Sequence, residues 1–214
     1  MSKPANTENT GGMRNFASPT PGLFPSPEAM RPTLVGSEYM ISAGHPLVAQ
    51  IAASILEKGG TAVDAGVAAG LASNVIQVDM CNFGGVAPTL LRLAGSSQVW
   101  SMSGVGYWGR KVTLEKFRAR YGDDMPLGAA VGVLPAAPDV WITALQRFDT
   151  MSFKDVAAPA IHYAEEAFPL DFRTATALEI LGPGLRKWER SRRMYHPEGR
   201  ETKLRERSVQ KELA

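Results

Sequence analysis

Hydrophobic residues first show helical spacing just after position 45. The stripe that repeats every three or four residues consists of Leu47, Val48, Ile51, Ile55 and Leu56. Pro46 stands where a helix can begin, because its missing N–H costs nothing in a first turn. Gly59 and Gly60 follow the stripe and are typical of a helix end. The pattern predicts a helix from residue 46 to about residue 58.

The next segment carries small side chains on nearly every face. Alanine and glycine surround Val63, Val67 and Leu71. Thr61 can cap a second helix, and Asp64, three residues later, has the spacing of a capping box near the positive helix end. We interpret Asp64 as a helix-start carboxylate rather than a catalytic acid or base. Because small side chains let neighbours approach closely, this helix is predicted to lie in the interior.

Short apolar runs predict strands in two places. Residues 39–43 form one such run, which directly precedes the first helix. Residues 88–94 and 98–102 form two more, separated by the turn residues Gly95, Ser96 and Ser97. Residues 88–94 and 98–102 are expected to pair as a β-hairpin.

Helical spacing returns in the second half of the chain. It predicts helices over 113–121, 138–148 and 153–166, and Ser152 is placed to cap the last of them. The charged stretch 185–214 has no sustained apolar stripe. We expect this stretch to be surface loop and helix.

Composition divides the chain into two parts. Residues 1–36 are rich in proline among serine, threonine, asparagine and glycine. Such a segment cannot bury enough apolar surface to order itself, so a flexible lead-in is predicted there. Residues 37–214 are predicted to form the folded segment, since 44% of the chain is hydrophobic.

The net charge of the chain gives little reason to expect binding to nucleic acid or to a membrane. The net charge is +2. Residues 182–214 hold ten Lys/Arg and five Asp/Glu, which gives +5 and leaves 13 and 16, or −3, for the rest. Because this basic stretch contains both basic and acidic side chains, we interpret it as a solvated surface rather than a binding site for nucleic acid. Residues 1–15 have no apolar core of a secretory signal, so a soluble, cytoplasmic protein without a membrane partner is expected.

The reactive side chains are few and scattered. Cys81 is the only cysteine, which excludes an internal disulfide, and an inert thiol is expected. His45, His162 and His196 lie far apart without ligand partners at metal spacing. We predict no metal and no cofactor, and we expect His45 to be a cap or turn residue.

One glycine pattern raises a nucleotide-binding alternative. Residues 104–109 have the form G-x-G-x-x-G after a predicted strand. Tyr107 and Trp108 are bulky for such a turn, and the next predicted helix begins only near residue 113. A structural turn is therefore favoured over a dinucleotide site.

Three longer segments carry a family resemblance. They are 41–47 (ISAGHPL), 56–65 (LEKGGTAVDA) and 157–166 (AAPAIHYAEE). Phe83-Gly-Gly-Val86 stands at the place of a glycine-rich turn, and Leu134-Pro135 resembles a "VPG" segment. In order and spacing, the chain from about Arg31 to its end resembles the large subunit of the γ-glutamyltransferase family.

The resemblance implies an α+β fold, the N-terminal-nucleophile (Ntn) hydrolase αββα sandwich, of which this chain would be a part. Family members cut themselves before a threonine, which then forms an acyl-enzyme with a γ-glutamyl or other small amide. That threonine would lie in the small subunit, so no catalytic residue is expected in this chain. The chain alone is predicted to be inactive, and its partners would be the small subunit and the rest of the large subunit. The alternative is a truncated, non-catalytic relative.

One substrate-binding position of the family falls inside the chain. The family has an arginine, in a "D-G-R-E-T-A-P" segment, that pairs with the substrate's α-carboxylate. An ungapped alignment back from Phe117 puts Val105 in its place, after Ser103 and Gly104. These three residues are the candidate substrate-binding residues. The valine implies an acyl group other than γ-glutamyl, unless Arg110 or Lys111 supplies the missing cation.

A second departure from the family bears on stability. Ala167 follows a predicted helix end where the family has glycine. If the backbone there is left-handed, alanine costs roughly 1 kcal/mol.

Overall fold

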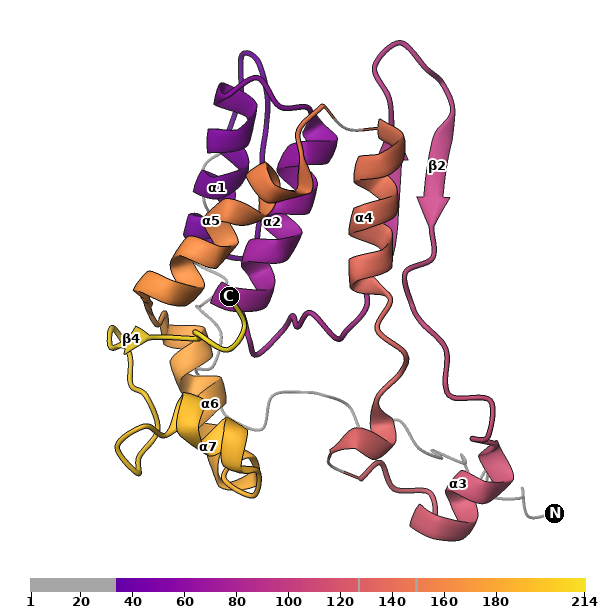
Figure 1. Ribbon diagram of the computed structural model, residues 1–214, viewed down its shortest axis with the longest axis vertical. Helices are drawn as coiled ribbons and strands as arrows, with labels where there is room; N and C mark the ends of the chain where they lie inside the picture. The colour runs from indigo at the N-terminus through magenta and orange to yellow at the C-terminus, as the bar shows by residue number, and fades with distance from the viewer. Residues whose placement is uncertain (1–33, 127, 149) are drawn as a thin grey trace, which may run out of the picture. The chain divides into compact units, whose positions relative to one another are not determined.

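The computed structural model describes residues 34–126, 128–148 and 150–214. Residues 35–214 form one compact unit. At its centre lies α2 (Ala62–Ile76), which contacts α1 (Pro46–Glu57), α4 (Ala137–Phe148) and α5 (Phe153–Glu166) (Figure 1). All four helices were predicted from spacing, and their presence is confirmed. The predicted lead-in at 1–36 lies, up to residue 33, outside the described residues.

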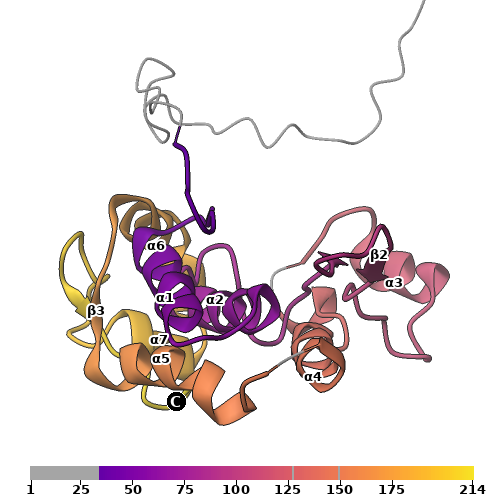
Figure 2. The same cartoon turned by 90° about the horizontal axis from the view of Figure 1, so that it is seen from above.

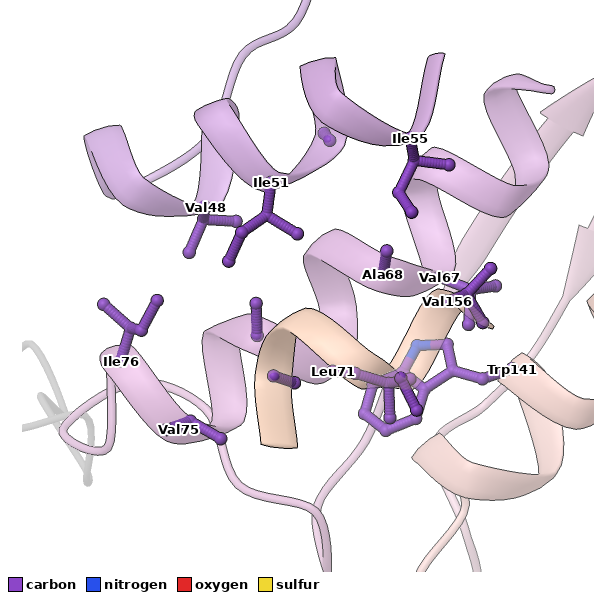
Figure 3. Close-up of a cluster of buried hydrophobic side chains, with 14 of the residues drawn as sticks. Val48, Ile51, Ile55, Val67, Ala68, Leu71, Val75, Ile76, Trp141 and Val156 are labelled. Atoms are coloured by element: carbon purple, nitrogen blue, oxygen red, sulfur yellow. The ribbon is translucent and has the colours of Figure 1, made fainter. Parts of the chain in front are cut away.

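Small side chains let the neighbouring helices approach α2. Ala68 and Ala72 have no exposed surface. A Cβ at Gly70 would lie 2.8 Å from Nε1 of Trp141 on α4, so only glycine allows this contact. Figure 3 shows side chains of α1, α4 and α5 packed against those of α2. The labelled residues are Val48, Ile51 and Ile55 of α1, Trp141 of α4, Val156 of α5, and Val67, Ala68, Leu71, Val75 and Ile76 of α2. The prediction that this helix is interior is confirmed.

The buried carboxylate of Asp64 starts α2 and holds a distant loop. Its Oδ2 accepts hydrogen bonds from the N–H and hydroxyl of Thr61 at 2.6 and 2.8 Å, which completes the predicted capping box. Thr150 donates from its N–H and its hydroxyl, and Met151 donates from its N–H at 3.2 Å. Burial by itself would raise the pKa of Asp64, but these hydrogen bonds outweigh it and lower the pKa.

The predicted hairpin is present. β1 (Thr89–Arg92) pairs antiparallel with β2 (Val99–Met102), with Thr89 opposite Met102. Gly95 in the turn has φ +73°, which suits glycine. The rings of Trp100 on β2 and Phe148 on α4 lie 5.5 Å apart, so the hairpin packs against α4 (Figure 1).

The prediction of a strand at residues 39–43 is wrong. These residues contain no strand. The strands of the described chain form two separate two-stranded sheets, β1–β2 and β3 (Phe168–Pro169) with β4 (Arg207–Ser208). An apolar run becomes a strand only where another strand offers hydrogen-bond partners, and neither sheet reaches this run. Helices and strand pairs together confirm the α+β class.

The last third of the chain is more buried than predicted and contains one helix that was not predicted. α6 (Phe172–Leu185) was not predicted, and α7 (Glu189–Tyr195) follows it (Figure 2). The expectation of surface structure throughout 185–214 is wrong at Gln210, which is 2% exposed. Its Nε2 donates to the carbonyl of Val75 at 2.7 Å and its N–H to that of Ala164 at 2.8 Å. Local spacing cannot reveal contacts between such distant residues.

Two short elements complete the described chain. The predicted helix near 113–121 is present as α3 (Leu114–Tyr121), with the Thr113 hydroxyl accepting from the N–H of Lys116. A 3₁₀ turn, η1, spans Ala129–Val131. Among the described residues, the helices are too short or too polar to cross a membrane.

Ala167 adopts a strained backbone conformation at the position where the resembled family has glycine. It follows α5 with φ +69° and ψ 156°, a region that glycine occupies almost alone. Its carbonyl accepts from the guanidinium of Arg207 at 3.3 Å, next to the β3–β4 pair. The surrounding contacts therefore hold an alanine in a conformation it disfavours.

Replacing the buried cap carboxylate tests its role. Asp64→Asn should lower the free energy of unfolding by about 3 kcal/mol, because the new amide would face N–H and O–H donors. Asp155→Asn is the matched control, since Asp155 has the same position on α5 but is exposed, and should cost less than about 1 kcal/mol. Urea unfolding measures both.

The pH dependence of this effect has a definite sign. Because folding lowers the pKa of Asp64, its contribution is complete above the unfolded value of about 3.9. It disappears as the pH falls through the lower, folded pKa. If the difference in free energy of unfolding between wild type and Asp64→Asn grew as the pH fell, this account would be contradicted.

Relieving the strain at Ala167 should stabilise the protein. Ala167→Gly is expected to raise the free energy of unfolding by about 1 kcal/mol. Ala158→Gly, at an exposed position within α5, should lower it by about 1 kcal/mol. Equal losses in both variants by urea unfolding would show that the backbone at 167 stores no strain.

Candidate functional site

A cavity of about 510 Å³ lies between the end of the hairpin and the start of α4. Three segments line it: residues 102–107, residues 134–136 and the first turns of α4 with Asp139, Val140 and Thr143. Residues 102–107 are separated in sequence from residues 134–143, so the cavity is a product of the tertiary fold.

Backbone pairing shapes the first wall. The carbonyl of Gly104 accepts from the N–H of Ala87 at 2.8 Å, and the carbonyl of Tyr107 accepts from the N–H of Leu134 at 2.8 Å. Gly104 and Gly106 have φ of +52° and +75°. A Cβ on either would lie 2.3 Å from a carbonyl oxygen, that of Ala87 or of Leu134. The two glycines therefore permit close contact between chain segments.

The same geometry explains the G-x-G-x-x-G pattern. Residues 104–109 contain no helix, and α3 begins only at Leu114. In a dinucleotide site this motif opens a helix whose N-terminus meets the pyrophosphate. The structure therefore supports the turn interpretation over the nucleotide one.

The glycine-rich turn at 83–86 anchors α4. The carbonyl of Gly85 accepts from the N–H groups of Ala136 and Ala137 at 3.1 and 3.2 Å. The ring of Phe83 lies 5.9 Å from that of Trp141. These contacts place the N-terminal turn of α4, and with it Asp139, at the cavity.

All three predicted substrate-binding residues line the cavity. Ser103, Gly104 and Val105 belong to its first wall, and the Val105 side chain is half-exposed. Arg110 and Lys111, considered as replacement cations, are exposed and lie outside the lining. Sequence reasoning missed Asp139 and Thr143, although a carboxylate in the first turn of a predicted helix was visible beside Leu134-Pro135.

Comparison with known proteins gives the family. The family model described as gamma-glutamyltranspeptidase matches residues 48–214. The chain belongs to the gamma-glutamyltranspeptidase family. The match covers every helix of the described chain except the first residues of α1.

Curated relatives of this family member are enzymes made as proenzymes. The glutathione hydrolase proenzyme of Bacillus subtilis strain 168 is 30% identical over 186 residues, which are 84% of this chain and 31% of that protein. The acylase ACY 1 proenzyme of Pseudomonas sp. strain SE83 is 31% identical over 144 residues, which are 62% of this chain and 25% of that protein. The chain thus spans a third or less of the length of these relatives.

A solved structure supports the same fold. Helicobacter pylori gamma-glutamyltranspeptidase matches with a TM-score of 0.79 at 24% identity, over 85% of this chain and 53% of that one. At this identity the likeness concerns the fold.

The histidines and the cysteine of this family member lie apart from the cavity lining. His45 caps α1, as predicted, with Nδ1 accepting from the N–H of Leu47 at 3.1 Å. His162 is exposed on α5, and His196 is buried near Glu201 with its Nε2 3.5 Å from the carboxylate. Burial, and next the charge of Asp79, raises the pKa of the Cys81 thiol. Among the described residues, no group of three His, Cys, Asp or Glu could hold a metal ion.

The glycine requirement at the cavity wall can be tested. Gly106→Ala should lower the free energy of unfolding by about 2 kcal/mol, because the methyl group meets the Leu134 carbonyl at a positive φ. Gly109→Ala in the same motif meets open space and should change it by less than about 0.5 kcal/mol. Equal tolerance of both variants in urea unfolding would contradict the proposed packing.

Proposed function

We propose that this chain is part of an Ntn amidohydrolase or acyltransferase that cleaves a small amide through an acyl-enzyme. Membership of the gamma-glutamyltranspeptidase family supports the proposal, as do the proenzyme relatives. The nucleophilic threonine would belong to a segment outside these 214 residues, so the chain alone would be inactive. Its partners would be the remainder of the large subunit and the small subunit of the same precursor.

We further propose that the strands described here join a larger sandwich. β1 and β2 pair with each other and leave an outer edge on each side. Leu90 on β1 and Val99 on β2 are exposed apolar residues. Open edges and exposed apolar side chains are features that a further strand or layer would cover. On this proposal residues 37–214 are one segment of the αββα fold.

The cavity supplies one wall of the acyl-group site in this proposal. At the place of the family's arginine it presents the apolar, half-exposed side chain of Val105. A bound α-carboxylate would lose charge-assisted hydrogen bonds worth about 1.5–3 kcal/mol each, or roughly tenfold to a hundredfold in affinity. Since Arg110 and Lys111 are outside the lining, neither replaces that cation in the described structure. We infer the preference for acyl groups without an α-carboxylate from this observation.

Paired substrates test both the reaction and its specificity. The longer, self-cleaved protein should hydrolyse the 4-aminobutanoyl anilide at least about tenfold better, in kcat/KM, than the γ-glutamyl anilide, which differs only by the α-carboxylate. Val105→Arg should shift the ratio toward γ-glutamyl by about tenfold or more. Release of the aniline, followed by absorbance, measures each rate.

Two controls delimit the result. The 214-residue chain alone should release no aniline from either substrate. A strong preference of the unmutated protein for γ-glutamyl would overturn the role given to Val105. Absence of turnover with any small amide would favour the alternative, a non-catalytic relative.

A further inference from the structure

The candidate cavity contains a carboxylate that the family comparison does not explain. Asp139 lies in the first turn of α4, is exposed and belongs to the lining of the cavity. Among the described residues that line this cavity, Asp139 is the only Asp, Glu, Lys, Arg or His. The formal charge of the lining is therefore negative.

The carboxylate has no cation of its own in the described chain. The ion pairs among the described residues involve other carboxylates, those of Asp79, Asp123, Asp171, Glu189, Glu198, Glu201 and Glu206. Arg147, the nearest basic residue in sequence, is outside the lining, as are Arg110 and Lys111. Asp139 is thus available to a ligand.

The other polar groups of the lining are compatible with a cation, and the carboxylate of Asp139 sets the sign of charge that the cavity favours. A helix N-terminus can bind an anion through its free N–H groups. At α4, however, the N–H groups of Ala136 and Ala137 both donate to the carbonyl of Gly85. The hydroxyls of Ser103 and Thr143, in contrast, can accept hydrogen bonds from an ammonium group.

Apolar residues complete the lining and suit an alkyl chain. Val105, Leu134 and Val140 line the cavity around Asp139. A carboxylate next to hydroxyls and apolar side chains matches a ligand that has a short alkyl chain with a positively charged end. A ligand with a carboxylate at the same place would meet the charge of Asp139 instead, at an energetic cost.

We propose that this cavity binds the ammonium end of an acyl group, with Asp139 as its counter-ion. The inference rests on the proposed amide-cleaving function and names the substrate class: amides of short ω-amino acids without an α-carboxylate. Asp139 is a specificity-determining residue in this account, and it takes no part in bond cleavage.

An isosteric pair of substrates isolates the charge. The 4-aminobutanoyl and pentanoyl anilides have acyl chains of equal length that end in ammonium and methyl. The self-cleaved full-length protein should hydrolyse the 4-aminobutanoyl anilide about tenfold better in kcat/KM, and the preference should shrink as salt rises. Asp139→Asn should abolish the preference. Glu115→Gln removes a charge on α3, outside the lining, and should retain the preference.

A binding measurement separates this inference from the proposed function. If neither anilide is cleaved, nor any other small amide, the proposed function fails, and calorimetric titration with 4-aminobutanamide and pentanamide then decides the inference. Tighter binding of the amine, lost in Asp139→Asn but kept in Glu115→Gln, would support it. Equal rates for the two anilides, equal binding or no binding of the two amides, or a preference that survives in Asp139→Asn would overturn it.

Discussion

Close packing around α2 is the constraint on which the rest of the described chain depends. Its alanines and glycines let α1, α4 and α5 lie directly against it, and larger side chains from those helices fill the space (Figure 3). At Gly70 the approach is so close that the Trp141 indole occupies the place of a side chain. Asp64 adds a polar constraint, because one buried carboxylate joins the start of α2 to the loop before α5.

The candidate site follows from this packing by a short chain of contacts. Trp141 holds α4 against α2, and the Gly85 carbonyl holds the N-terminus of α4 beside the hairpin. Gly104 and Gly106 then let residues 103–107 pass close to neighbouring backbone. The cavity is thus supported by backbone hydrogen bonds and core packing.

Two side chains give the cavity its chemical character. On the proposed assignment, Val105 takes the place of the cation of a γ-glutamyl site, and Asp139 adds a carboxylate to the lining from α4. Under this proposal, the two residues together reverse the polarity of the site that the resemblance implies. Family membership therefore supports the class of reaction, while the substrate is proposed from these two residues.

The sequence by itself determined the local features of the protein. The α1 stripe, the Thr61–Asp64 capping box and the hairpin turn depend on neighbours within a few residues, so spacing and residue type were sufficient to predict them. The GGTAVD run also pointed to the correct family. Ser103, Gly104 and Val105 were chosen by alignment, and the fold brings them into one cavity.

Only the tertiary structure decided what depends on distant partners. The apolar run at 39–43 was predicted to be a strand, but strand formation needs a neighbouring strand that local sequence cannot supply. Gln210 looked like part of a solvated tail, yet its side chain reaches the Val75 carbonyl across 135 positions. Asp139 became a candidate only when α4 was placed beside residues 103–107, because the environment of a charge depends on which segments surround it in space.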